Sequence, residues 1–146
     1  MKTLLVLLIL LASCTAQHLQ VGEQHNAPVV ISVAGISNIN SVGGIDVYIN
    51  FTNTSGRTIN YLTFVVEAYN RVGDPVRCEI KRSSTVALRA TGPYQHGRGT
   101  SILNPGRWET VFYNHSIREI KLKEIIIEYA NGQEEIIAEK DIIYSR

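Results

Sequence analysis

The sequence predicts a single all-β domain, an immunoglobulin- or fibronectin III-like antiparallel β-sandwich of about seven to eight strands. Three observations support this fold. The chain has 146 residues, 45% of them hydrophobic, which suits one compact domain. From residue 28 onward apolar and polar residues alternate with a period of two, and helical spacing is nearly absent. Turn residues separate the alternating segments at intervals of about ten residues, as in two packed antiparallel sheets. A small barrel is the alternative.

Turn residues divide the first part of the domain into expected strands at 29–33, 45–52, 58–70, 76–81 and 85–89. The second of these shows the clearest half-buried pattern in the chain. In the turn that follows it, Gly56 is the residue expected to adopt a positive φ. Cys78 lies among alternating apolar and charged residues, so we expect a small buried thiol rather than a reactive one.

The C-terminal part is expected to hold a strand at 107–114 and a hairpin of 117–129 with 135–143. Asn131-Gly132 lies between the two hairpin strands and predicts a type I′ turn, in which both central residues have positive φ. Trp108, the sole tryptophan, is expected to pack in the core.

The first 16 residues have the layout of a secretory signal peptide. Lys2 precedes nine unbroken apolar residues, Leu4 to Ala12, and small residues follow them. Nine helical residues span roughly 14 Å, about half of the hydrocarbon core of a bilayer, so this segment is too short for a transmembrane anchor. The chain is therefore expected to be exported.

Residues Leu11-Ala12-Ser13-Cys14 resemble the lipobox of bacterial lipoproteins. The resemblance implies cleavage before Cys14, a thioether-linked diacylglycerol on its sulfur and acylation of the new amino terminus. Two or three acyl chains would hold the domain durably on a membrane. The expected organisation is a signal peptide at 1–13, a lipidated N-terminus and flexible tether at 14–27, and the sandwich domain at 28–146. The alternative is cleavage after Ala16, which would release an unanchored secreted module.

Residues 47–76 resemble the FxLYD type of bacterial extracytoplasmic module. A strand, the turn Asn53-Thr-Ser-Gly-Arg-Thr-Ile59, a second strand and a turn with Tyr69 and Gly73 follow in the family's order, and Pro105-Gly106 is similar to a later Pro-Gly turn. The namesake motif is altered, since only Tyr69 matches it. The resemblance implies an immunoglobulin-like sandwich on a cell-surface or periplasmic lipoprotein, and the family offers no catalytic residues.

The charge pattern excludes some partners. A formal charge of +1 and a pI near 7.8 argue against a nucleic-acid-binding protein and against a polybasic membrane binder, so the membrane is expected to be reached through the lipid anchor only. Residues 71–107 nevertheless hold seven basic against two acidic residues, and residues 108–146 hold five against eight. Mutual solvation of neighbouring strands is the simplest interpretation. The alternative is a patch for an anionic glycan or an acidic protein, formed by Arg71, Arg77, Lys81, Arg82, Arg89, Arg98 and Arg107.

The sequence shows no recognisable catalytic, phosphate-binding or metal-binding motif. It contains no nucleophile elbow, no phosphate-binding loop and no metal-ligand spacing, and His96 and His115 stand apart from other ligand-type residues. We therefore expect no catalysis, no cofactor and no metal. Three sequons, at Asn50, Asn53 and Asn114, would matter only in a eukaryotic secretory source.

The segment 91–106 lacks periodicity, and such a long loop is usually a binding loop or simply mobile. Tyr94, His96 and Arg98 are its recognition-type side chains. The sequence thus predicts an exported, lipid-anchored, non-catalytic binding or assembly module of the bacterial cell envelope, with an envelope protein or a glycan as partner. The alternatives are the unanchored secreted module and a small secreted metal-binding protein or enzyme with a site near 91–106.

Overall fold

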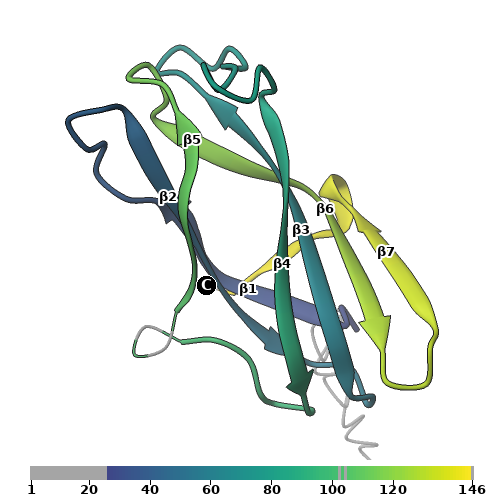
Figure 1. Cartoon of the computed structure of the whole chain (residues 1–146). Helices are drawn as coiled ribbons and strands as arrows, with labels where there is room; N and C mark the ends of the chain where they lie inside the picture. The colour runs from purple at the N-terminus through teal and green to yellow at the C-terminus, as the bar shows by residue number, and fades with distance from the viewer. Residues whose placement is uncertain (1–25, 102, 104, 146) are drawn as a thin grey trace, which may run out of the picture.

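The computed structural model describes residues 26–101, 103 and 105–145, which form two four-stranded sheets (Figure 1). The elements are β1 (Val29–Ile36), β2 (Gly44–Asn53), β3 (Ile59–Tyr69), β4 (Thr85–Tyr94), β5 (Gly106–Tyr113), β6 (Glu119–Tyr129), β7 (Glu134–Ala138), the short 3-10 helix η1 (Glu139–Asp141) and β8 (Ile143–Tyr144). The described residues include no α-helix and no helix long and apolar enough to span a bilayer. The signal peptide, the lipobox and most of the expected tether lie outside the described residues.

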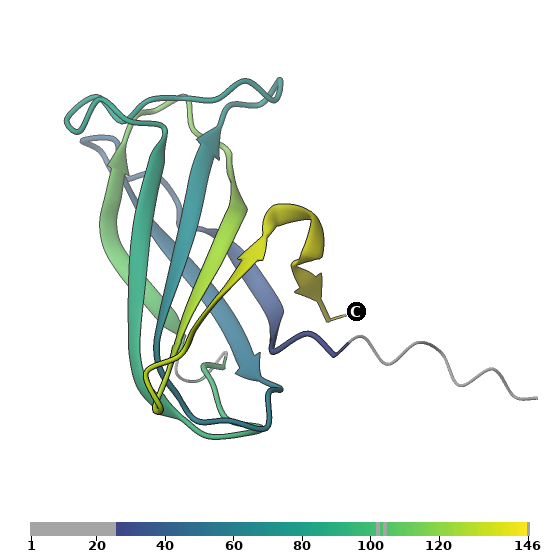
Figure 2. The same cartoon turned by 90° about the vertical axis from the view of Figure 1, so that its right-hand side faces the viewer.

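The strand order is β5-β2-β1-β8 in one sheet and β4-β3-β6-β7 in the other. Figure 2 shows the two layers facing each other. The predicted sandwich is confirmed, and the first seven strands have the order of a fibronectin type III domain. One pairing differs from the purely antiparallel expectation, because β8 runs parallel to β1 through Val30 and Ile31.

The core lies between the inner faces of the two sheets. In β2 the residues Ile45, Val47, Ile49 and Phe51 are fully buried, as the alternation predicted. Phe51 meets Phe64 of β3 across the core, with 5.4 Å between the ring centroids. Burial of each such side chain contributes about 1.5–3 kcal/mol to folding, so the period-two pattern is the main determinant of this fold.

The β6–β7 hairpin forms where Asn131-Gly132 predicted it, but the turn type was wrong. The Gly132 N–H donates to the carbonyl of Tyr129, and the Tyr129 N–H donates to the carbonyl of Gln133. Only Gly132 has a positive φ, of 83°. The loop is therefore a type I turn closed by a glycine bulge rather than a type I′ turn.

The β2–β3 turn also differs from expectation, since Gly56 does not adopt a positive φ. Instead, hydrogen bonds of the Asn53 side chain close this turn. Its side chain is buried, its amide group donates to the carbonyls of Arg57 and Tyr94 at 2.8 Å each, and its carbonyl oxygen accepts from the N–H of Ser55. Because these bonds close the turn, no left-handed residue is needed there.

The expected strand at 76–81 is instead a turn. Cys78 is buried as predicted, but Ile80, expected on the same inward face, is largely exposed. The Cys78 sulfur accepts hydrogen bonds from the N–H groups of Lys81 and Tyr113. Burial raises the pKa of the thiol, yet these N–H donors more than offset it and leave the pKa below its usual value.

Two further features near the edges of the sandwich differ from expectation, one strand boundary and the burial of Trp108. The expected strand at 135–143 ends at Ala138, turns through η1 and enters the other sheet as β8. Trp108 of β5 is half-buried rather than fully enclosed. It lies edge-on to Phe64, with 6.0 Å between the centroids, and its indole N–H donates to the carbonyl of Arg89 on β4. Trp108 thus closes the side of the sandwich between β4 and β5.

Candidate functional site

The three predicted recognition residues do not form one site. Tyr94 is the last residue of β4, and its ring packs edge-on against Phe51 with 5.0 Å between the centroids. Desolvation there raises the pKa of its phenol. His96 and Arg98 are exposed, and His96 places Nδ1 2.8 Å from the carbonyl oxygen of Ser55. Tyr94 therefore serves the core, whereas His96 and Arg98 border the β2–β3 turn.

Residues 95–100 are bound to the edge of β2 rather than forming a free loop. Asn53 donates its N–H to the carbonyl of Arg98, and Thr100 donates its N–H to the carbonyl of Phe51. The Thr100 hydroxyl also accepts from the N–H of Phe51 and donates to the carbonyl of Ile49, at 3.1 Å each. A Cβ at Gly99 would lie 1.9 Å from the Phe51 carbonyl oxygen, so only glycine fits this close approach.

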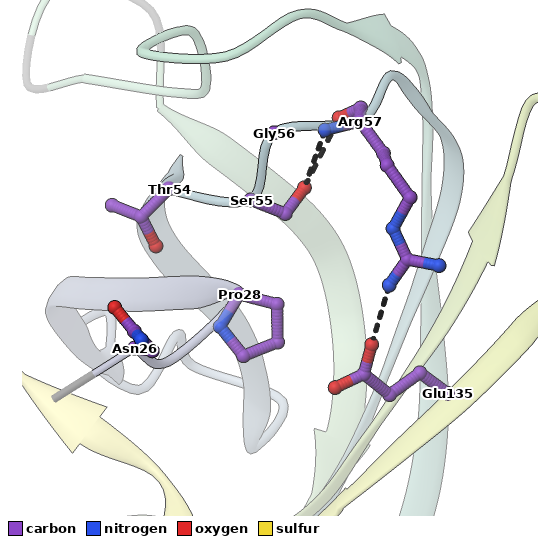
Figure 3. A pocket seen from close by; sticks show the side chains of 7 residues that line it. All are labelled: Asn26, Pro28, Thr54, Ser55, Gly56, Arg57 and Glu135. Carbon is purple, nitrogen blue, oxygen red and sulfur yellow. Dashed lines mark hydrogen bonds and ion pairs between the residues drawn. The ribbon is translucent and has the colours of Figure 1, made fainter.

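A polar cleft of about 280 Å³ lies where the described chain enters the domain, and Figure 3 shows its lining. Asn26 and Pro28 form one side, residues 54–57 the other, and Glu135 of β7 lies below them. Arg57 donates to Glu135 and Gln133 and stacks 3.5 Å above the ring of Tyr129. Because its guanidinium is engaged by these partners, we interpret this cleft as a structural junction.

A second depression, of about 480 Å³, lies on the outer face of the β5-β2-β1-β8 sheet, and we call it the outer-face groove. Its surface is mostly apolar, with a few polar groups, as in many small-molecule sites. The outward side chains of β2 form its floor, and residues near β1 and β5 form its sides. The lining residues are Val33, Ser37, Asp46, Tyr48, Asn50, Pro105 and Arg107.

Tyr48 crosses the floor of the groove because its partner on β1 has no side chain. Gly35 lies opposite Tyr48 in the register, and a Cβ on Gly35 would come within 2.6 Å of the phenol oxygen. The ring therefore lies on the backbone of β1. A tyrosine packed flat over a strand glycine also stabilises a sheet, so this contact has a structural role as well.

Asn50 is the unusual residue of the groove. It is only 3% exposed, and its Oδ1 atom has no hydrogen-bond partner among the described residues. Its backbone carbonyl, by contrast, accepts from the hydroxyl of Ser32. A buried polar group without a partner costs about 1–3 kcal/mol, so its retention in a strand calls for an explanation.

Asp46 forms the fixed side of the groove. Its carboxylate accepts from the N–H of Thr110 at 2.8 Å and from Nε of Arg107 at 3.1 Å. The Thr110 hydrogen bond, followed by the Arg107 partner, lowers the pKa of Asp46 below its usual value. Thr110 has a φ of 53°, rare for a β-branched residue, and it lies where the β2–β5 register shifts. Asp46 therefore holds a bulge in β5 and stays ionised.

This arrangement can bind a small ligand but offers no evident nucleophile or acid–base pair. Within residues 26–101, 103 and 105–145, no three His, Cys, Asp or Glu side chains gather as a metal site. The groove was not predicted from the sequence, because Asp46, Tyr48 and Asn50 have the alternating pattern expected of side chains that face solvent from a half-buried strand. Comparison of the chain with protein-family models, curated proteins and solved structures gave no match.

Proposed function

We propose that the protein is an exported, lipid-anchored and non-catalytic binding module of the bacterial cell envelope, which binds a saccharide in the outer-face groove. The observation that carries this proposal is the buried Asn50 amide, which borders the groove without a partner for its Oδ1 atom. A buried polar group that has no hydrogen-bond partner in the fold can obtain one from a ligand that binds beside it.

The groove's chemistry favours a sugar over a purely apolar ligand. The side-chain amide of Asn50 can exchange a hydrogen bond with a sugar hydroxyl or acetamido group, which an acyl chain cannot provide. The apolar face of a pyranose ring can pack on Tyr48, Val33 and Pro105. The ion pair of Asp46 and Arg107 adds a charged rim whose position is fixed by Thr110.

The lipid anchor is supported by the sequence Leu11-Ala12-Ser13-Cys14. If the expected tether behaves as coil, about ten residues of it would span roughly 15–20 Å and separate the sandwich from the headgroups. The test is the intact mass of protein purified from its producer, together with its partition into detergent. We expect a chain that begins at Cys14, carries acyl chains and enters the detergent phase. A chain that begins at Gln17 and stays in the aqueous phase would support the secreted module.

The groove is tested by calorimetric titration of the processed protein with soluble N-acetylglucosamine oligosaccharides. Replacing Asn50 with leucine keeps the branched shape and the number of side-chain heavy atoms but removes the amide. We expect Asn50→Leu to weaken binding between about fivefold and a hundredfold and to stabilise the fold by about 1 kcal/mol. Asn60→Leu, a half-buried substitution on β3 outside the groove, is the control and should leave affinity unchanged. Equal affinity of the wild-type protein and Asn50→Leu for the oligosaccharide would refute the proposal that it binds in the outer-face groove.

A further inference from the structure

Two loops and one connecting segment gather at the end of the sandwich opposite the entry of the described chain. They are the loops 37–43, 70–84 and the β5–β6 segment 114–118, which lie together at the top of Figure 1. The chain enters at the other end, where Pro28 accepts the N–H groups of Thr54 and Ser55. We call the end formed by these three segments the distal pole.

Hydrogen bonds hold the distal pole together around the segment 114–118. Asn114 donates its backbone N–H to the carbonyl of Gly43 and its side-chain amide to the carbonyl of Arg77, both at 3.1 Å. Arg118 donates its N–H to the carbonyl of Tyr69, at the start of the loop 70–84. Residues far apart in the sequence therefore share one surface.

Each loop of the distal pole carries an exposed aliphatic side chain. Val42 is 70% exposed, Val72 is 81% exposed and Ile80 is 65% exposed. Single exposed aliphatic residues are ordinary on a protein surface. Val42 on one loop and Val72 and Ile80 on the other, however, form a set at one pole that could enter an apolar phase together.

Basic side chains surround these aliphatic residues. The three segments hold five basic residues, Arg71, Arg77, Lys81, Arg82 and Arg118, against two acidic residues, Asp74 and Glu79. None of the five forms an ion pair with any residue that the structure describes. By contrast, Arg89 pairs with Glu128 and Arg107 with Asp46, so the basic residues of 71–107 do not make one patch.

We propose that the distal pole binds the surface of an anionic lipid bilayer. Lysine and arginine are attracted to anionic headgroups, and aliphatic side chains next to them can enter the headgroup–acyl boundary. An acidic protein partner fits less well, because a stable protein interface usually centres on aromatic anchors in a pocket, whereas Val42, Val72 and Ile80 stand singly on loops. This surface adjoins the outer-face groove at Ser37, but the proposal uses none of the groove's other residues.

The backbone of Arg82 gives an independent indication of function at this pole. Arg82 has a φ of 59°, a left-handed conformation in which glycine is far less strained. It closes a turn by donating its N–H to the carbonyl of Cys78. The side chain of Arg82 is exposed on this turn and forms no ion pair with a described residue, so its charge is available to a ligand.

The proposal is tested with the chain that begins at Gln17, which keeps every described residue and has no acyl anchor. Sedimentation is measured with vesicles of phosphatidylglycerol mixed with phosphatidylcholine and with vesicles of phosphatidylcholine alone. We expect binding only to the anionic vesicles, with affinity falling as salt rises. The triple variant Val42→Ser, Val72→Ser, Ile80→Ser should bind about tenfold more weakly or worse. The matched control removes three exposed apolar residues elsewhere, Leu103→Ser, Ile136→Ser and Tyr144→Ser, and should bind as the wild type does.

Arg82→Gly separates binding from folding. It should lower the vesicle affinity about fivefold, the effect expected of one basic residue near an anionic surface, while leaving the fold equally or more stable. Equal binding to both kinds of vesicle would overturn the proposal. So would undiminished binding by the aliphatic triple variant, or binding to soluble polyglutamate as tight as to vesicles. The last result would assign the pole to an acidic polymer or protein.

Discussion

A methyl group at Gly99 tests whether the segment 95–100 belongs to the sheet edge or is a mobile binding loop. The ideal Cβ would lie 1.9 Å from the carbonyl oxygen of Phe51, and real Cβ atoms essentially never come closer than 3.0 Å. The segment would therefore have to move by at least 1.1 Å, the difference between these distances. Such a shift breaks the bonds from Thr100 to Phe51 and from Asn53 to Arg98.

Three hydrogen bonds at about 0.5–1.5 kcal/mol each give an expected loss of roughly 2–4 kcal/mol for Gly99→Ala. The control is Gly56→Ala, because Gly56 has nothing within 4 Å of an added Cβ and no positive φ. That variant should be neutral or more stable by up to about 1 kcal/mol. Urea unfolding followed by Trp108 fluorescence measures both. If the unfolding free energy of Gly99→Ala lies within about 0.5 kcal/mol of that of Gly56→Ala, the segment 95–100 is not bound to β2 and the prediction is refuted.

Three further predictions concern single side chains. The lowered pKa of Asp46 contributes stability that is present above its ordinary value of 3.8 and is lost as the pH falls through the lower folded value. Asp46→Asn should therefore be less stable than the wild type at neutral pH. The difference in unfolding free energy between the two proteins should become smaller as the pH is lowered, which circular dichroism can follow. Asn53→Ala should cost about 3 kcal/mol in urea unfolding, because it leaves the buried turn unclosed. Cys78 should react with a thiol reagent only at the rate of unfolding, and fast labelling of the native protein would contradict its burial.

The strands could be predicted because the pattern that specifies them is local. Alternation in 45–52 alone predicts that Ile45, Val47, Ile49 and Phe51 share the inward face. Asn131-Gly132 alone indicates a hairpin. The boundaries that were wrong depend on distant residues. Residues 95–100 extend the edge of the sheet because they hydrogen-bond to the backbone of β2. Likewise, β8 forms because it pairs with the edge of β1 at Val30 and Ile31.

The candidate sites could not be predicted for a similar reason. Tyr48 lies over Gly35 only when the register of β1 and β2 is known. Val42 belongs to one loop and Val72 and Ile80 to another, and both loops hydrogen-bond to the segment 114–118. The sequons at Asn50 and Asn53 give a converse example. Both residues are buried, so their triplets cannot carry glycans on the folded chain.

Local anomalies distinguish structural features of this fold from candidate binding surfaces. Thr110 has an unfavourable φ, but its N–H meets the carboxylate of Asp46, so the strain has a structural compensation. The side-chain oxygen of Asn50 has no such compensation among the described residues, and Arg82 forms no ion pair with them. Residues that break a local rule without a partner in the fold are expected where a ligand supplies the partner. On this criterion Asn50 is the residue of the proposed groove that lacks a partner, whereas the N–H of Arg82 is bonded to Cys78 and only its exposed charge suits the proposed distal pole.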